Sequence, residues 1–168
     1  MRPIPPLTLC LLLAACGGGG GGNSAPSAGS SPSFEVAPAT IAAGSDETEL
    51  AFAVGSGFAA TPVLLEAHFH LPPQLRVPVQ DPLVASSSLV TLDGEARADG
   101  FLVVCGDAVN PEPSPLPIGE LFRLRVQAGQ PRQPGTYAIT VDGLRASTAN
   151  GDPVPLGSDS FTVNVTVE

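Results

Sequence analysis

Apolar and polar side chains alternate along this chain, and this period of two constrains its fold more than any other feature. The pattern is unbroken in the last segment, residues 161–168, where every second side chain from Phe161 to Val167 is apolar. Successive side chains of a β-strand point to opposite faces, so the alternation predicts strands with one buried and one solvated face. No stretch of eleven residues or more shows a clear helical period. The chain is therefore predicted to be all-β.

The alternating segments are short, and glycine, proline, asparagine and aspartate residues separate them. We expect eight or nine strands, from the segments 34–36, 49–55, 62–71, 75–77, 88–92, 100–105, 118–127, 137–142 and 161–168. Short strands at this spacing, without intervening helices, predict an antiparallel sandwich or barrel, and we expect a β-sandwich of jelly-roll or immunoglobulin-like type. Residues 33–168 are expected to form this domain. At this length it buries roughly two-thirds of its unfolded surface, so it needs neither a metal nor a disulfide to fold.

The N-terminal residues are typical of an export signal. Arg2 precedes an apolar run of nine residues, 7–15, which ends in small side chains. This is the layout of a secretory signal peptide. A helix that spans a bilayer needs roughly 20 apolar residues. Residues 1–15 are therefore expected to be a signal peptide rather than a permanent anchor.

The tetrapeptide Leu-Ala-Ala-Cys at 13–16 resembles a bacterial lipobox. The resemblance implies that Cys16 is lipidated and becomes the first residue of the mature protein. The alternative is an ordinary signal peptide with an incidental cysteine. No acidic residue follows Cys16, so the resemblance also implies that the retention signal of inner-membrane lipoproteins is absent. We expect an exported, lipid-anchored protein at the outer membrane or the cell surface.

A glycine-rich segment connects this cysteine to the predicted domain. Six consecutive glycines, 17–22, precede a run of Asn, Ser, Ala, Gly and Pro that ends at Pro32. Such a composition buries too little apolar surface to offset the entropy of ordering. Residues 16–32 are therefore expected to form a flexible tether, with a reach of about 20–25 Å from the square-root scaling of a flexible coil.

Charge and motifs exclude several classes of function. The chain has 16 acidic and 7 basic residues, no lysine and a net charge of −9, so it lacks the basic surface of a nucleic-acid-binding protein. It contains no serine-hydrolase elbow, no P-loop and no dinucleotide-binding glycine motif after a strand. With no Trp and a single Tyr, it offers no evident sugar-stacking cleft for a glycosidase. We therefore expect that the protein is not an enzyme.

Two histidines are the candidates for metal ligands. His68 and His70 lie two residues apart on one predicted strand, so both point to the face that also carries Glu66. Imidazole nitrogens at this spacing chelate zinc, and a carboxylate adds a third ligand. The alternative is a polar sheet face with two solvated imidazoles. Because the chain has no other His and the sequence indicates no fourth ligand, we expect no metal there.

Other charged and thiol side chains have simpler explanations. An acidic group around residue 100 lacks EF-hand spacing, so we expect solvated loop charge and no bound Ca²⁺. Its acidic members are Asp93, Glu95, Asp99 and Asp107, and Asn110 follows them. Arg123 and Arg125 face solvent on one predicted strand, as either a recognition stripe for an acidic partner or an ordinary solvated face. Cys105 shares the face of Phe101 and Val103 and is predicted to be a buried core residue.

The order of strands and turns resembles that of cohesin domains. The similar segments are 43–54, 66–77, 118–126, 135–139 and 149–154, which together extend over almost all of residues 34–168. The segment 118–126 contains Gly-Glu-Leu, similar to the Gly-x-Leu start of a strand in that family, and 149–154 contains an Asn-Gly turn. The resemblance implies the β-sandwich of the cohesin and carbohydrate-binding superfamily.

Cohesins proper bind dockerin modules through one sheet face, and relatives in the superfamily bind polysaccharides. The resemblance therefore implies a non-catalytic, membrane-anchored binding or scaffolding module with a dockerin-like or other surface protein as its partner. The alternative is a carbohydrate-binding module linked to polysaccharide breakdown. Sugar binding normally uses exposed aromatic rings, and most of the seven Phe lie at inward positions. We therefore expect a protein partner.

Overall fold

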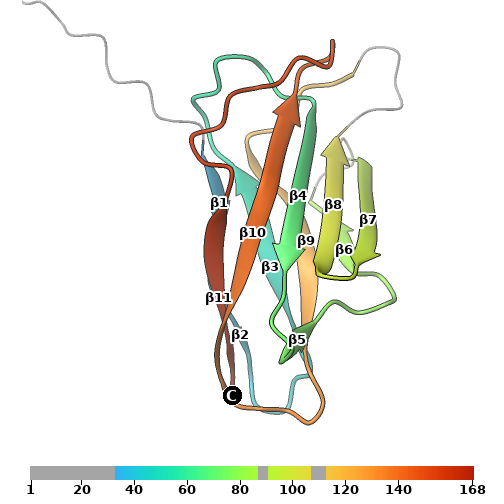
Figure 1. The fold of residues 1–168 in the computed structure, drawn as a ribbon, viewed down its shortest axis with the longest axis vertical. Coiled ribbons are helices and arrows are strands. Elements are labelled where there is room, and N and C mark those ends of the chain that lie inside the picture. Colours follow the sequence, from blue (N-terminus) through green and yellow to red (C-terminus); the bar gives the residue numbers. More distant parts are fainter. Residues whose placement is uncertain (1–32, 87–90, 107–112) are drawn as a thin grey trace, which may run out of the picture.

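The computed structural model describes residues 33–86, 91–106 and 113–168 of the chain. The predicted signal peptide, Cys16 and the tether of residues 16–32 lie outside these ranges. Within them the chain forms eleven β-strands and no helix (Figure 1). The described part accordingly has no helix that is long and apolar enough to span a bilayer.

The strands form two sheets that lie face to face (Figure 1). The first sheet contains β1 (Phe34–Val36), β3 (Glu47–Val54), β5 (Leu75–Arg76), β6 (Leu83–Ala85) and β9 (Gly119–Ala128). The second contains β2 (Ala39–Ile41), β4 (Leu64–His70), β7 (Thr91–Arg97), β8 (Gly100–Gly106), β10 (Gly135–Ser147) and β11 (Phe161–Val167). The first sheet has the order β1-β3-β9-β5, with β6 also paired to β9, and the second has the order β2-β11-β10-β4-β8-β7.

The two sheets share the N-terminal segment of the domain. β1 pairs with β3 in the first sheet, and β2 follows directly and pairs with β11 in the second. The pairing of β2 with β11 is parallel, and all other named pairs are antiparallel. The predicted all-β sandwich is confirmed, with one parallel pair at an edge.

Two strands, β2 and β6, were not predicted from the sequence. β2 and β6 have three residues each, and their pairing with longer strands identifies them. The strand expected at 88–92 is displaced along the chain, since β7 begins at Thr91 and ends at Arg97. Residues 88–90 lie outside the described part.

β10 continues past the predicted end at residue 142 because a bulge interrupts its alternation. Its register with β4 shifts between Asp142 and Arg145. Gly143 there has a φ of 59°, a left-handed conformation that costs glycine little. On either side of the bulge, Val141 and Leu144 are both buried. The bulge thus restarts the inward set of side chains, and the strand is longer than the simple period indicates.

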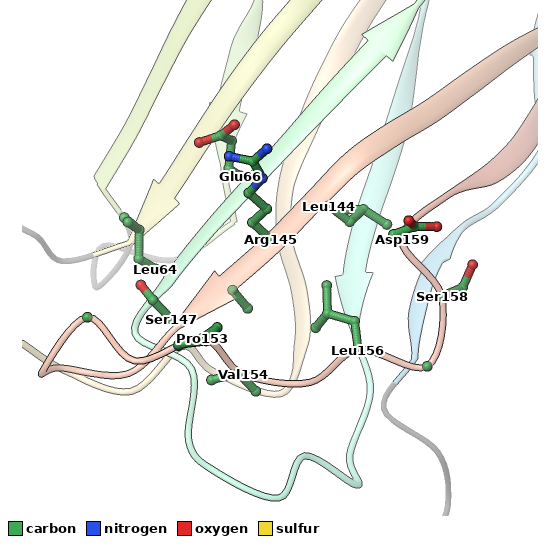
Figure 2. Close-up of a pocket in the computed structure, with 13 residues that line it drawn as sticks. Leu64, Glu66, Leu144, Arg145, Ser147, Pro153, Val154, Leu156, Ser158 and Asp159 are labelled. Atoms are coloured by element: carbon green, nitrogen blue, oxygen red, sulfur yellow. The ribbon is translucent and has the colours of Figure 1, made fainter.

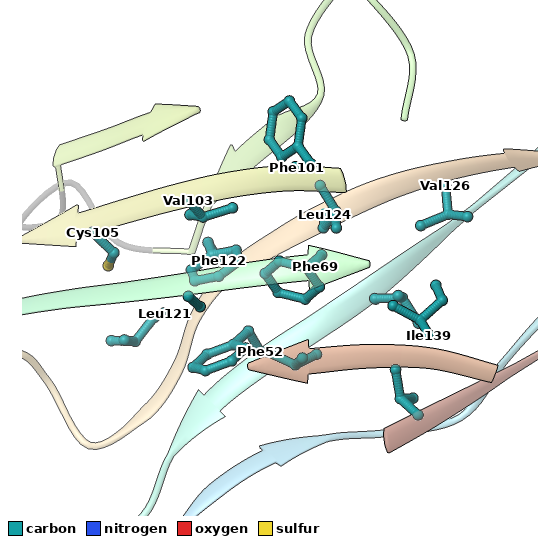
Figure 3. Close-up of a cluster of buried hydrophobic side chains, with 14 of the residues drawn as sticks. Phe52, Phe69, Phe101, Val103, Cys105, Leu121, Phe122, Leu124, Val126 and Ile139 are labelled. Atoms are coloured by element: carbon teal, nitrogen blue, oxygen red, sulfur yellow. The ribbon is translucent and has the colours of Figure 1, made fainter. Parts of the chain in front are cut away.

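Three phenylalanines from both sheets form the centre of the core (Figure 3). Phe52 and Phe122 stack with ring centroids 4.9 Å apart, and Phe69 meets Phe52 edge-on at 6.2 Å. Cys105 lies in the same core, where burial raises the pKa of its thiol to about 12. The prediction that Cys105 is a buried core residue is confirmed. This packing fixes the strands whose outer faces carry the polar side chains described next.

Candidate functional site

The outer face of the second sheet carries the most varied set of side chains. Alternation along β4 buries Leu65, Ala67 and Phe69 and leaves the side chains between them half-buried. These outward residues are Leu64, Glu66, His68 and His70. The neighbouring strand β8 places Val104 opposite Glu66 and Leu102 opposite His68. This face therefore combines carboxylate, imidazole and aliphatic groups.

A cluster of two histidines and two aspartates lies on this face. The Nε2 of His70 lies 2.9 Å from Oδ1 of Asp142 on β10, and its Nδ1 lies 2.9 Å from the backbone carbonyl oxygen of Asp99. The Nδ1 of His68 is 3.9 Å from the same Oδ1 of Asp142, and its Nε2 is 3.5 Å from Oδ1 of Asp99. The two imidazole centroids are 4.1 Å apart. The fold thus brings together four groups from β4, β10 and the β7–β8 turn.

The two aspartates raise the pKa of His70. Burial alone lowers the pKa of His70, but the hydrogen bonds to Asp142 and to the carbonyl of Asp99 outweigh it, and the pKa is raised above its ordinary value. The negative charges of both aspartates act in the same direction. When protonated, the His70 ring donates from both nitrogens, to Asp142 and to the Asp99 carbonyl.

An open groove of about 720 Å³ adjoins the cluster (Figure 2). Leu64 and Glu66 of β4 and the end of β10 form one side, and the segment 151–159 forms the other. Arg145 and Glu66 are paired neighbours in the β4–β10 ladder, next to the pair of Asp142 and His68. The groove and the cluster are therefore two parts of one surface.

Arg145 is the basic group of this groove. Its side chain is exposed and forms no ion pair with any other described residue. Leu144, Val154 and Leu156 also line the groove, but Leu144 and Val154 are at most 4% exposed and belong to the core, whereas Arg145 is directed toward Glu66 (Figure 2). The groove thus offers an exposed arginine that forms no ion pair with a described residue, beside apolar lining groups.

The outer face of the first sheet is different, because its charges compensate one another. Arg123 lies 2.8 Å from Glu120 and 3.3 Å from Glu49, and Arg125 lies 3.5 Å from Glu49. Hydrogen bonds from Ser86 and Arg123 lower the pKa of Glu120, and the bonds to Glu120 and Glu49 raise the pKa of Arg123. The two arginines named in the sequence analysis thus form an ionic network within their own sheet.

No protein-family model and no curated protein sequence matches this chain. Solved structures do match. The sixth cohesin of Acetivibrio cellulolyticus scaffoldin B, in complex with a Cel5 dockerin, is 13% identical with a TM-score of 0.64, covering 83% of this chain and 100% of that one. The described domain has the cohesin fold.

Two further cohesins have similar values. The cohesin of a type I cohesin–dockerin complex from Clostridium thermocellum is 10% identical with a TM-score of 0.61, covering 82% of this chain and 99% of that one. A non-cellulosomal cohesin from the archaeon Archaeoglobus fulgidus is 14% identical with a TM-score of 0.57, covering 82% and 92%. At these identities the likeness establishes the fold, and the resemblance noted in the sequence is confirmed at that level.

The structure keeps two of the three metal-ligand candidates from the sequence analysis together and separates the third from them. His68 and His70 meet Asp142, and this trio has one ligand atom per residue within 4.8 Å of the others. Glu66 is not part of the trio. Asp142 was not foreseen, because it lies 72 residues from His70 in sequence, and no local pattern marks it.

The members of the acidic group around residue 100 also lie in different parts of the structure. Asp99 joins the histidine cluster, whereas Asp93 and Glu95 lie on β7, where Glu95 forms a 2.7 Å ion pair with Arg97. Asp107 and Asn110 lie outside the described residues.

Proposed function

We propose that residues 33–168 are a non-catalytic recognition module that binds a dockerin-like protein outside the cytoplasm. The observation that carries this proposal is the cohesin fold, which the domain shares with modules solved in complex with dockerins. The compact sandwich and its open surfaces suit binding rather than turnover.

The outer face of the second sheet is the proposed docking surface. Protein interfaces concentrate their energy in a few desolvated aromatic or arginine side chains, surrounded by a polar rim. The groove beside β10 offers Arg145 without an ion pair among the described residues, next to apolar lining groups. On the first sheet, by contrast, Arg123 and Arg125 are held by Glu49 and Glu120. A partner that docked there would have to displace those ion pairs.

A polysaccharide is the less favoured ligand. In the described ranges, the exposed large hydrophobic side chains are Val79 and Ile118, and neither is aromatic. Partly buried rings, such as Phe161 and Tyr137, pack against the core. The described part of the surface therefore lacks the open ring on which a sugar stacks.

The proposal includes export and a lipid anchor. It rests on the apolar run of residues 7–15 and on the lipobox-like sequence that ends at Cys16. Residues 16–32 would then hold the module about 20–25 Å from the membrane. We place it at the outer membrane or the cell surface, since no acidic residue follows the cysteine.

A pull-down tests the recognition proposal. The purified chain is used as bait for secreted proteins and for insoluble cell-wall glycans of its own organism, with and without Ca²⁺. We expect one protein with a duplicated calcium-binding motif of the dockerin type, and Arg145→Ala should weaken its binding by about 30-fold or more, as for an arginine hot spot that contributes at least about 2 kcal/mol.

Arg76→Ala is the matched control. Arg76 is an exposed arginine on β5 of the first sheet, and it too forms no ion pair within the described ranges. Equal loss in both variants would refute the assignment to the second sheet. Retention on glycan alone would replace the protein partner by a polysaccharide.

A further inference from the structure

We infer that His68, His70 and Asp142 form a binding site for a divalent transition metal of the Zn²⁺ class on the outer face of the second sheet. This inference is independent of the proposed partner, because it concerns the chemistry of these side chains alone. From the sequence we expected no metal at these histidines and considered Glu66 as the third candidate ligand, whereas in the structure Asp142 takes that place.

The distances within the trio suit a zinc ion. Tetrahedral Zn²⁺ with bonds of about 2.0–2.2 Å separates its ligand atoms by about 3.3–3.6 Å. Oδ1 of Asp142 lies 2.9 Å from Nε2 of His70 and 3.9 Å from Nδ1 of His68. These two separations bracket the required value, so Asp142 lies close to the tetrahedral ligand spacing from both imidazoles.

Asp99 lies beside the two remaining ring nitrogens, in the position of the outer partners that metal-bound histidines use. A metal-bound histidine normally donates its other N–H to a carbonyl or a carboxylate, which fixes the tautomer. Asp99 supplies both acceptors. Its carbonyl oxygen lies 2.9 Å from Nδ1 of His70, and its carboxylate lies 3.5 Å from Nε2 of His68. This leaves Nε2 of His70 and Nδ1 of His68 to face Asp142 with their lone pairs.

One ring nitrogen of the cluster lacks a hydrogen-bond partner within the described part of the chain. The Nε2 of His68 is buried and forms no hydrogen bond with the described residues. With a metal ion on Nδ1, the proton of His68 lies on Nε2 and is donated toward the Asp99 carboxylate, which is 3.5 Å away. Gly100 leaves room for this nitrogen, since a Cβ there would lie 3.1 Å from Nε2 of His68 and would clash with the carbonyl of Phe69.

The charge of the cluster and its exposure to solvent both suit a divalent metal ion. Two neutral imidazoles with the carboxylates of Asp142 and Asp99 balance a charge of +2. The side chains of His68, His70 and Asp142 are 19%, 30% and 44% exposed, so an ion can enter from solvent. Water, or a donor from another molecule, would complete its coordination. Imidazole is a ligand for zinc, copper and nickel, whereas calcium and magnesium require oxygen.

Calorimetric titration of the purified full chain, without a polyhistidine tag, tests this site. We expect ZnCl₂ to bind with one-to-one stoichiometry and CaCl₂ to give no binding. His70→Gln and Asp142→Asn should each lower the zinc affinity by more than about 100-fold, which exceeds the loss typical of outer partners, and Asp99→Asn by about 10-fold.

Asp93→Asn is the matched control. Asp93 lies on β7 of the same sheet, outside the trio, and its Oδ1 accepts a bond from the neighbouring Gly94 N–H that asparagine can also accept. Its zinc affinity should equal that of the unchanged chain. Circular dichroism and the urea midpoint establish that each variant is folded, as expected for substitutions on an outer face.

Nitrogen NMR of the unchanged chain supplies a readout that needs no variant. Zinc should shift Nε2 of His70 and Nδ1 of His68, while the other two ring nitrogens stay protonated. No saturable zinc binding, binding that survives His70→Gln and Asp142→Asn, or coordination through other nitrogens would each overturn the inference. The cluster would then be an ion-pair network between imidazolium and aspartate.

Discussion

Arg132 joins three distant segments at one end of the sandwich, and its removal should destabilise the domain. From the β9–β10 connection, its guanidinium donates to the backbone carbonyls of Ser45, Ile41, Ala42 and Glu168. The bonds to Ser45 and Ile41 are part-buried, whereas those to Ala42 and Glu168 are exposed. Arg132 thus holds the β2–β3 turn and the end of β11 together.

The expected loss of stability depends on which of these hydrogen bonds are part-buried. An intramolecular hydrogen bond contributes about 0.5–1.5 kcal/mol net, and about 1.5–3 kcal/mol when one group is charged. Carbonyls exposed in Arg132→Ala bind water instead, so we count only the two part-buried bonds, at about 1–1.5 kcal/mol each, below the charged-group range because water partly replaces them too. Arg132→Ala should therefore lower the free energy of unfolding by about 2–3 kcal/mol, a large share of the about 5–15 kcal/mol typical of a domain.

Urea unfolding followed by circular dichroism measures this loss as a lower midpoint at an unchanged slope. Arg132→Lys should recover less than half, because an ammonium group cannot reproduce the planar fork that reaches several carbonyls. Arg97→Ala is the control, since the ion pair of Arg97 with Glu95 is exposed and such pairs contribute about 0–1 kcal/mol. A loss below about 0.5 kcal/mol in Arg132→Ala, or full recovery by lysine, would refute the reasoning.

Three further predictions concern single side chains. Cys105 has a pKa raised to about 12 by burial, so a thiol reagent at pH 8 should label it only after unfolding, and stoichiometric labelling of the native domain would contradict its place in the core. The Ser86 and Arg123 hydrogen bonds lower the pKa of Glu120, so their contribution to stability is present above the unfolded carboxyl pKa and is lost as pH falls through the folded one. Ser86→Ala should raise the pKa of Glu120 in a carboxyl NMR titration, and an unchanged value would exclude that bond as a cause. Cys16→Ser should abolish incorporation of labelled palmitate and release the protein from the detergent phase, whereas unchanged membrane retention would refute the lipid anchor.

The two outer faces of the sandwich show why exposed charge alone does not identify a binding surface. Arg123 and Arg145 are both outward-facing arginines on long strands. Glu120 and Glu49 neutralise Arg123, whereas Arg145 has no such partner among the described residues. Glu120 lies three residues from Arg123 on β9 itself, and the pairing of β3 with β9 adds Glu49. By contrast, Glu66 lies opposite Arg145 but forms no ion pair with it.

The sequence by itself determined the class of the fold and the inward face of most strands. The alternation in β4 assigns Phe69 to the core and His68 and His70 to the outer face, and the structure places them so. The alternation in β8 likewise assigns Cys105 to the core. These predictions succeed because the direction of a side chain depends only on its position within its own strand. The export signal and the lipidation of Cys16 remain predictions from the sequence.

Only the tertiary structure decided which strands are neighbours and in what register. The ladder between β4 and β10 brings Asp142 to His68, and the bulge at Gly143 then sets Arg145 beside Glu66. Neither contact has a local signature, because strands far apart in sequence pair through the packing of a whole core and through bulges that break the simple period. The residues of the inferred metal site and the groove beside it therefore become neighbours only in the folded domain.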